Sequence, residues 1–184
     1  MNVPVRKSPR LIGYDYSKPG AYFVTICVRD RKNLLSKIKT HSYLKEYSDN
    51  SIVGTGVLDC PINKLTKYGE IANKHLEHMG GFYEDIKISK YVIMPNHIHI
   101  LIEIFGSKNS YGQPRTSVPT NSKLAQFVST FKRLCNREYG ENIWQGRFHD
   151  HIVRGKTDYE KIWYYIDTNV IRWKEDCFYT EAID

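Results

Sequence analysis

The stretch His97-Ile-His-Ile-Leu-Ile-Glu-Ile-Phe105 decides the fold, because its apolar and polar residues alternate. Successive side chains of a β-strand point to opposite faces of a sheet, so the four isoleucines share one face. The two histidines share the other face with Leu101 and Glu103. The isoleucine face has to be buried, and we expect two amphipathic helices to cover it. Residues 97–105 are therefore predicted to form a strand with a chemically distinct second face.

The elements on either side predict an antiparallel sheet with helices. β-Branched and aromatic runs predict strands, and apolar residues three and four apart predict helices. The strands are expected at 21–28, 86–94 and 148–154, and the helices at 67–80, 123–137 and from 157 to about 175. Gly80-Gly81 is expected to stop the first helix. The order predicts an α+β class, a split β-α-β arrangement with an extra C-terminal helix.

The length of 184 residues predicts a single domain, 1–184. We expect this domain to carry a basic N-terminal arm, 1–20, and an insertion, 29–65. The formal net charge is +7, and nine of the 27 Lys and Arg residues but only two acidic residues lie in 1–39. This asymmetry favours a polyanionic partner such as nucleic acid, and a solubilising terminus is the alternative.

Other composition features exclude several classes of protein. No apolar run is long enough to span a bilayer, and the N-terminus has no apolar segment typical of a secretory signal. The four cysteines are scattered without a CxxC pair. This pattern argues against a zinc ribbon or a disulfide framework, so we expect a cytoplasmic protein without a membrane partner.

Two groups of residues suggest chemistry. His97 and His99 are two residues apart on one strand face, ~7 Å between Cα atoms, so both can reach one metal ion. Hydrogen-bonding strand histidines are the alternative. Tyr165 and Asn169 share one face of the last helix. If this helix packs on the histidine face, Asn169 can supply a third ligand oxygen and Tyr165 a nucleophile. A packed aromatic residue is the alternative for Tyr165.

Four motifs carry a family resemblance, in family order from residue 10 to about 173. Met94-Pro-Asn-His-Ile-His-Ile-Leu101 resembles the His-hydrophobic-His (HUH) motif of the single-tyrosine transposases. The segments 10–27 (Arg-Leu-Ile-Gly-Tyr-Asp-Tyr to Thr-Ile-Cys), 144–154 (Trp-Gln-Gly-Arg-Phe-His-Asp-His-Ile-Val-Arg) and 165–169 (Tyr-Ile-Asp-Thr-Asn) are similar to those of the REP-associated tyrosine transposases.

The resemblance implies a ferredoxin-like HUH nuclease fold with a C-terminal catalytic helix. It implies nicking and rejoining of single-stranded DNA, as in DNA transposition, with a 5′-phosphotyrosine on Tyr165 and a free 3′-hydroxyl. Mg²⁺ or Mn²⁺ held by His97, His99 and Asn169 would polarise the scissile phosphate. Related enzymes recognise a hairpin beside the cleaved strand, and relatives act either as homodimers or as monomers. The residues expected to bind DNA are Arg6, Lys7, Arg10, Lys18, Arg29, Arg31 and Lys32.

One departure from the family pattern, one competing tyrosine and two alternative functions accompany this interpretation. Val170 stands where the family usually has Pro, so the helix is expected to run on through Trp173. Tyr164 competes with Tyr165 but points about 100° away around the helix. A non-catalytic nucleic-acid-binding module on the same fold is the first alternative function. A zinc hydrolase, in which water attacks, is the second.

Overall fold

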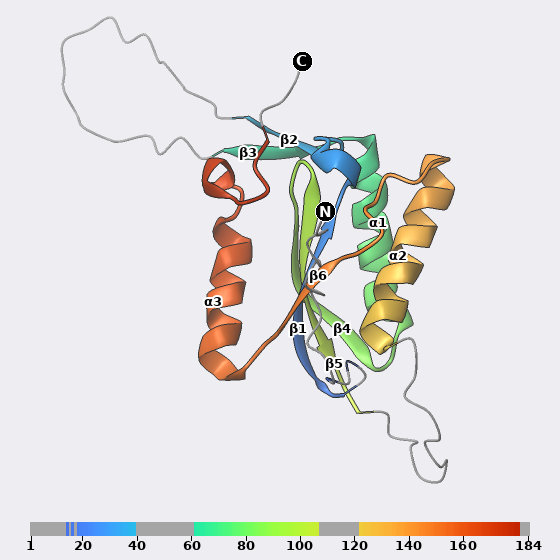
Figure 1. Ribbon diagram of the computed structural model, residues 1–184, viewed down its shortest axis with the longest axis vertical. Coiled ribbons are helices and arrows are strands. Elements are labelled where there is room, and N and C mark those ends of the chain that lie inside the picture. The colour runs from blue at the N-terminus through green and yellow to red at the C-terminus, as the bar shows by residue number, and fades with distance from the viewer. Residues whose placement is uncertain (1–13, 15, 17, 40–60, 107–121, 181–184) are drawn as a thin grey trace, which may run out of the picture.

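The computed structural model describes residues 14, 16, 18–39, 61–106 and 122–180. Its centre is a four-stranded sheet with the order β4-β5-β1-β6 (Figure 1). The strands are β1 (Gly20–Cys27), β4 (Ile86–Ile93), β5 (His97–Ile104) and β6 (His149–Ile152). Both β4 and β1 run antiparallel to β5, and β6 runs antiparallel to β1. The α+β class with a mainly antiparallel sheet is thereby confirmed.

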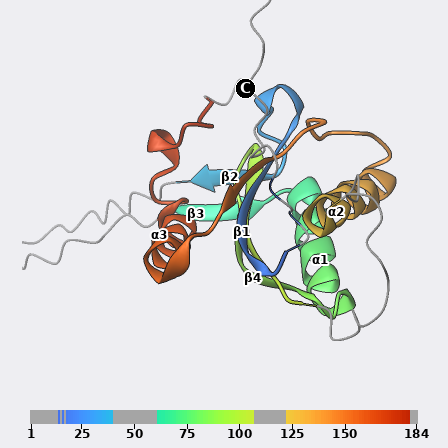
Figure 2. The same ribbon diagram turned by 60° about the horizontal axis from the view of Figure 1, so that its bottom comes forward.

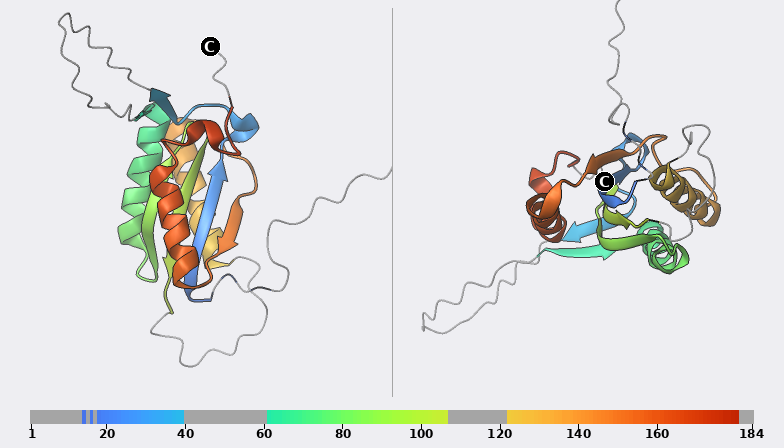
Figure 3. Two further views of the ribbon diagram at one scale, coloured as in Figure 1. Left: turned by 90° about the vertical axis from the view of Figure 1, so that its left-hand side faces the viewer. Right: turned by 90° about the horizontal axis from the view of Figure 1, so that it is seen from below.

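Three helices cover the two faces of this sheet. They are α1 (Lys67–Phe82), α2 (Lys123–Tyr139) and α3 (Gly155–Thr168). Figure 2 shows α1 and α2 side by side on one face, and Figure 3 shows α3 lying across the other. None of the helices in the described part of the chain combines the length and the apolar character that crossing a membrane requires.

The two faces of β5 bury different residues, as the alternation predicts. All four isoleucines of this strand belong to the main apolar core, with Phe127 and Phe131 of α2. On the opposite face, Leu101 packs against Ile162 and Ile166 of α3 in a second, smaller cluster. This cluster fixes the rotation of α3 on the sheet. The residues of α3 that neighbour its apolar stripe are thereby turned toward the histidine end of β5.

The C-terminal ends of the first and last helices differ from the sequence prediction. The first helix continues through Gly80 and Gly81 to Phe82, because buried Met79 holds its last turn against the core. The last helix ends at Thr168 instead of about Glu175. The chain then turns into a short 3₁₀ helix, η2 (Trp173–Glu175), and returns toward the sheet. Buried contacts of Asn169 and Trp173 favour this turn over a longer helix.

The described parts of the insertion form a 3₁₀ turn, η1 (Arg29–Arg31), and a two-stranded antiparallel ribbon. The ribbon consists of β2 (Ser36–Lys39) and β3 (Ile62–Leu65). It lies beside the turn between β4 and β5 (Figure 1). Two side chains fix it there, because Ser36 Oγ and Asn63 Nδ2 both donate to the carbonyl oxygen of Ile93.

Candidate active site

His97 and His99 lie at the start of β5, with both imidazoles on the same face of the sheet. Both side chains are buried, and their Nε2 atoms are 2.9 Å apart. The ring of Phe23 on β1 stacks on His99 at a centroid distance of 5.0 Å. The expectation that the two rings converge from one strand face is confirmed, and their role as metal ligands stays a prediction.

The outer ring nitrogens of both histidines are held by polar side chains. His97 Nδ1 lies 2.8 Å from Asn96 Oδ1. The amide nitrogen of Asn96 donates to the carbonyl oxygen of Phe178 and to Thr180 Oγ1, which turns its oxygen toward the ring. His97 Nδ1 therefore carries the proton, and Nε2 of the neutral ring has a free lone pair. His99 Nδ1 lies 2.9 Å from Thr25 Oγ1, so the second ring is oriented in the same way.

Burial keeps both histidines neutral. Loss of hydration lowers the pKa of His99, and it lowers the pKa of His97 well below the usual value with help from the neighbouring His99. A neutral imidazole is the form that binds metal ions. At 2.9 Å, one of the two Nε2 atoms can donate a hydrogen bond to the other, or both can bind one cation. The geometry therefore suits a shared proton or a metal ion.

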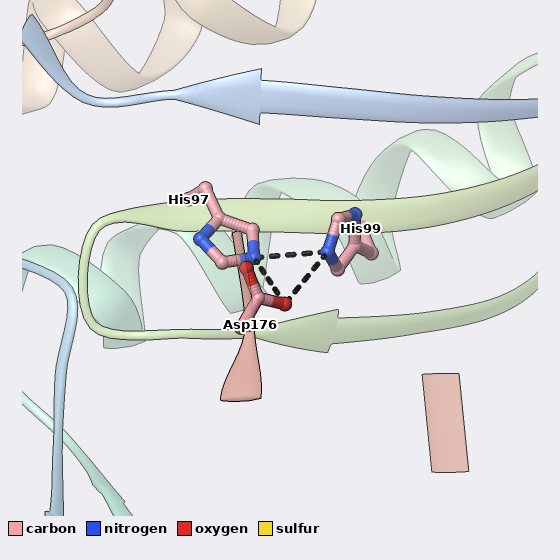
Figure 4. A group of neighbouring side chains, drawn as sticks. All are labelled: His97, His99 and Asp176. Carbon is pink, nitrogen blue, oxygen red and sulfur yellow. Dashed lines mark hydrogen bonds and ion pairs between the residues drawn. The ribbon is translucent and has the colours of Figure 1, made fainter. Parts of the chain in front are cut away.

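Asp176 completes a cluster that the sequence analysis missed. It directly follows η2, and its Oδ2 atom lies 4.0 Å from His97 Nε2 and 3.8 Å from His99 Nε2 (Figure 4). One ligand atom from each of the three residues lies within 4.8 Å of the others. Burial alone would raise the pKa of Asp176. Hydrogen bonds from His99, the Phe178 amide and Asn169 instead lower it well below the usual value, so the carboxylate is ionised.

A sequence signal for Asp176 existed. It lies eleven residues after Tyr165 and seven after Asn169, spacings that return to the same side of a helix. In the structure Asp176 does lie beside Tyr165 and Asn169, but it is not on their helix, because the chain leaves α3 and folds back. The spacing therefore made Asp176 a candidate metal ligand, although it lies well after the predicted site residues in the sequence.

Tyr165 presents its hydroxyl to this cluster. The phenolic oxygen donates to Asp176 Oδ2 at 2.9 Å and lies 3.3 Å from His99 Nε2. Burial, followed by the hydrogen bond to Asp176, raises the pKa of Tyr165, so the phenol is protonated at neutral pH. By contrast, the side chain of Tyr164 is 65% exposed. The structure thus turns Tyr165, and not Tyr164, toward the histidines.

Asn169 caps the C-terminus of α3 and is buried beside Asp176. Its Nδ2 donates to Asp176 Oδ2 at 3.0 Å, while its Oδ1 is buried without a hydrogen-bond partner. An amide oxygen in that state is a suitable ligand for a divalent cation. With two imidazoles, one carboxylate and this oxygen, the residues present fit such an ion, although the role of Asn169 as a ligand stays a prediction.

The residues expected to bind DNA are scattered. Arg6, Lys7 and Arg10 lie outside the described residues. Lys18 is exposed at the end of β1 remote from the histidines, whereas Arg29 and Lys32 are exposed near them. Arg31 donates to the carbonyl oxygen of Cys177 and lies 4.6 Å from the centre of the Phe178 ring. It therefore holds the segment that carries Asp176, and DNA contacts by this group stay predictions.

The fold and the site together define an α+β protein in which a helix-borne tyrosine faces a candidate metal centre. No family model matches the chain. It is 29% identical over 189 residues to an uncharacterised protein of Haemophilus influenzae strain Rd, covering 96% of this chain and 94% of the relative. It is 25% identical over 166 residues to a second protein of that strain, whose name assigns it to the REP-associated tyrosine transposases; 86% of this chain and 74% of the relative are covered.

A solved structure shows the same fold. It is a REP-associated tyrosine transposase bound to a REP hairpin, with a TM-score of 0.55 and 19% identity. The match covers 89% of this chain and 73% of that one. The comparisons confirm the resemblance to the REP-associated tyrosine transposases that the motifs indicate.

Proposed function

We propose that this protein nicks and rejoins single-stranded DNA through a covalent bond between Tyr165 and a 5′-phosphate. One observation carries the proposal: the Tyr165 hydroxyl lies 3.3 Å from His99 Nε2 and 2.9 Å from Asp176 Oδ2, at the edge of a buried group that fits a divalent cation. A nucleophile beside a candidate metal centre is what phosphoryl transfer needs. The relatedness to transposases supports the same role.

The exchange conserves the number of phosphodiester bonds. Tyr165 Oη gives up its proton and forms a bond to phosphorus while the bond from phosphorus to the 3′-oxygen breaks. The departing 3′-oxygen takes up a proton, which leaves a 3′-hydroxyl and a 5′-phosphotyrosine. Attack by a 3′-hydroxyl reverses the step, so rejoining requires no nucleotide cofactor. Asp176 Oδ2 accepts the phenolic hydrogen bond and thereby orients the nucleophile. Mg²⁺ or Mn²⁺ held by His97 and His99, with Asn169 or Asp176, would polarise the scissile phosphate as a Lewis acid.

The proposed substrate is a single strand beside a hairpin. The solved relative with the same fold is bound to a REP hairpin. A basic chain with exposed Arg29 and Lys32 near the histidines suits the phosphates of such a substrate. We extend the hairpin to this protein as part of the proposal.

A covalent-adduct assay tests the function. The cleaved strand stays attached through its 5′-phosphate, so the oligonucleotide carries its label at the 3′ end. With Mg²⁺ or Mn²⁺, the wild-type protein should give a labelled band that survives denaturation, and chelation of the metal should abolish it. Tyr165→Phe should remove both the adduct and the nick while DNA affinity is retained.

Tyr164→Phe is the matched control, because it removes one hydroxyl from an exposed neighbour. We expect at most a mild loss of activity. If Tyr165→Phe still cuts in the presence of metal, water is the nucleophile and the hydrolase interpretation replaces this one. If no oligonucleotide is cut but DNA is bound, the protein is a binding module.

A further inference from the structure

The ribbon β2–β3 has two faces of opposite character. Ser36 and Asn63 bond to the turn region of the main sheet, and Leu65 packs against the core. The residues that alternate with them form the outer face, which we name the lysine face. It consists of Lys37, Lys39, Ile62 and Lys64, and all four are exposed.

Two of these lysines face each other directly. Lys37 pairs with Lys64 across the antiparallel ribbon, and Lys39 pairs with Ile62. Like charges opposite each other destabilise a strand pair. Within the described residues, none of the three lysines forms an ion pair, whereas four other lysines do, such as Lys74 with Glu138. Because the described part of the chain gives these three positive charges no acidic partner, the face is complementary to an external polyanion.

The lysine face also lies at the functional end of the sheet. The ribbon is bonded to the carbonyl oxygen of Ile93, the last residue of β4, and His97 begins the next strand. Leu35, directly before β2, donates its amide to the carbonyl oxygen of Pro95 in the same turn. Figures 1 and 3 show the ribbon extending outward from this end. A strand held at Tyr165 would place its flanking nucleotides near this face.

We propose that the lysine face binds backbone phosphates of the DNA that flanks the cleaved strand, an inference that rests on the proposed function. Lysine is a point charge that attracts phosphate without reading bases, so this contact supplies affinity and register and no sequence preference. The phosphates belong to the paired stem of a hairpin or to unpaired nucleotides. A two-stranded ribbon is narrow enough for the major groove of a stem.

The test compares two triple variants with the same loss of charge. Lys37→Gln/Lys39→Gln/Lys64→Gln removes the lysine face. The control, Lys87→Gln/Lys156→Gln/Lys161→Gln, removes three exposed lysines at the other end of β4 and α3. Binding is measured by fluorescence anisotropy across a salt series, with a DNA hairpin carrying a single-stranded extension and with an unpaired strand of equal length.

The ribbon variant should bind at least about tenfold more weakly at ~0.1 M salt, and its salt slope should fall by roughly 2 to 2.7. The control variant should change little. An effect confined to the hairpin probe assigns the phosphates to the stem, and an equal effect on both probes assigns them to the single strand. Equal losses in both variants, or no loss in the ribbon variant, would overturn the proposal.

A single substitution separates binding from folding. Lys64→Glu puts a carboxylate opposite Lys37, so the ribbon should be as stable as in the wild type, while DNA binding weakens. If Lys64→Glu leaves affinity unchanged, the lysine face does not touch DNA. If the wild type binds through this face but forms no adduct, the proposed function fails and the binding site stands. If the wild type binds no DNA, both proposals are wrong.

Discussion

Replacing Asp176 best shows whether its carboxylate or the amide oxygen of Asn169 is the third metal ligand beside the two histidines. Its Oδ2 accepts hydrogen bonds from both Tyr165 and Asn169 and lies beside both histidines. Asp176→Asn keeps the shape but removes the charge. We expect Mn²⁺ affinity to fall by roughly 10- to 100-fold, on the scale seen when groups that support a metal site are lost. Isothermal titration calorimetry measures it.

Asn169→Ala is the comparison, because it removes the buried Oδ1 and leaves the carboxylate in place. If Asp176→Asn binds Mn²⁺ as tightly as the wild type and Asn169→Ala does not, the amide oxygen is the third ligand. His97→Ala should abolish binding in either case, since its Nε2 is common to both sets of ligands.

The sequence permits different degrees of prediction for the site residues. Strand alternation is enough to place His97 and His99 on one face, and helical spacing is enough to choose Tyr165 over Tyr164. Asp176 depends on a turn after Thr168, where contacts of the buried Asn169 and Trp173 outweigh the helical tendency of the segment. The helical spacing from Tyr165 and Asn169 marks Asp176 as a candidate but does not predict the turn that brings its carboxylate to the histidines, so the sequence analysis missed it.

At the scale of elements, the sequence predicts the centres of strands and helices better than their ends. β1 and β5 lie within one residue of their expected bounds, because buried apolar runs define them. The ends of α1 and α3 are set by tertiary packing. The two short ribbon strands have no apolar run of their own, and the sequence analysis placed them only within a broad insertion.

Lys132 links α2 to the segment before β6 and makes stability depend on pH. Its Nζ donates to the carbonyl oxygens of Gln145 and Arg147. Burial lowers the pKa of Lys132 from 10.5 to about 8. Between these values the unfolded chain binds more protons than the folded chain, so stability attributable to this group rises as pH increases from about 8 to 10.5.

The prediction is a difference in slope. The free energy of unfolding, measured with urea at several pH values, should rise by about 2 kcal/mol less in Lys132→Met than in the wild type across this window, after allowance for partial exposure. Lys156→Met is the control, since that side chain is 88% exposed. Parallel curves for Lys132→Met and the wild type would show that the buried amine is not neutralised.

At the scale of the whole molecule, the positive charge lies mostly outside the candidate active site. The buried group contains two neutral imidazoles and one carboxylate, whereas exposed lysines cover the ribbon beside it. Chemistry and DNA affinity can therefore be separated by mutation. Variants of the histidines or Tyr165 should lose cleavage and keep DNA binding, because the residues proposed to bind phosphates lie elsewhere.

The N-terminal arm supplies the last prediction. Deleting residues 1–10 removes Arg6, Lys7 and Arg10 but spares Tyr14 and Tyr16, which pack on the core. If all three cations contact phosphates, the slope of log affinity against log salt should fall by roughly 2 to 2.7. Combined with the ribbon variant, the two losses should add, since separate phosphates are involved. An unchanged slope would mean that the arm only solubilises the chain, and the lysine face would then carry the larger share of the DNA affinity.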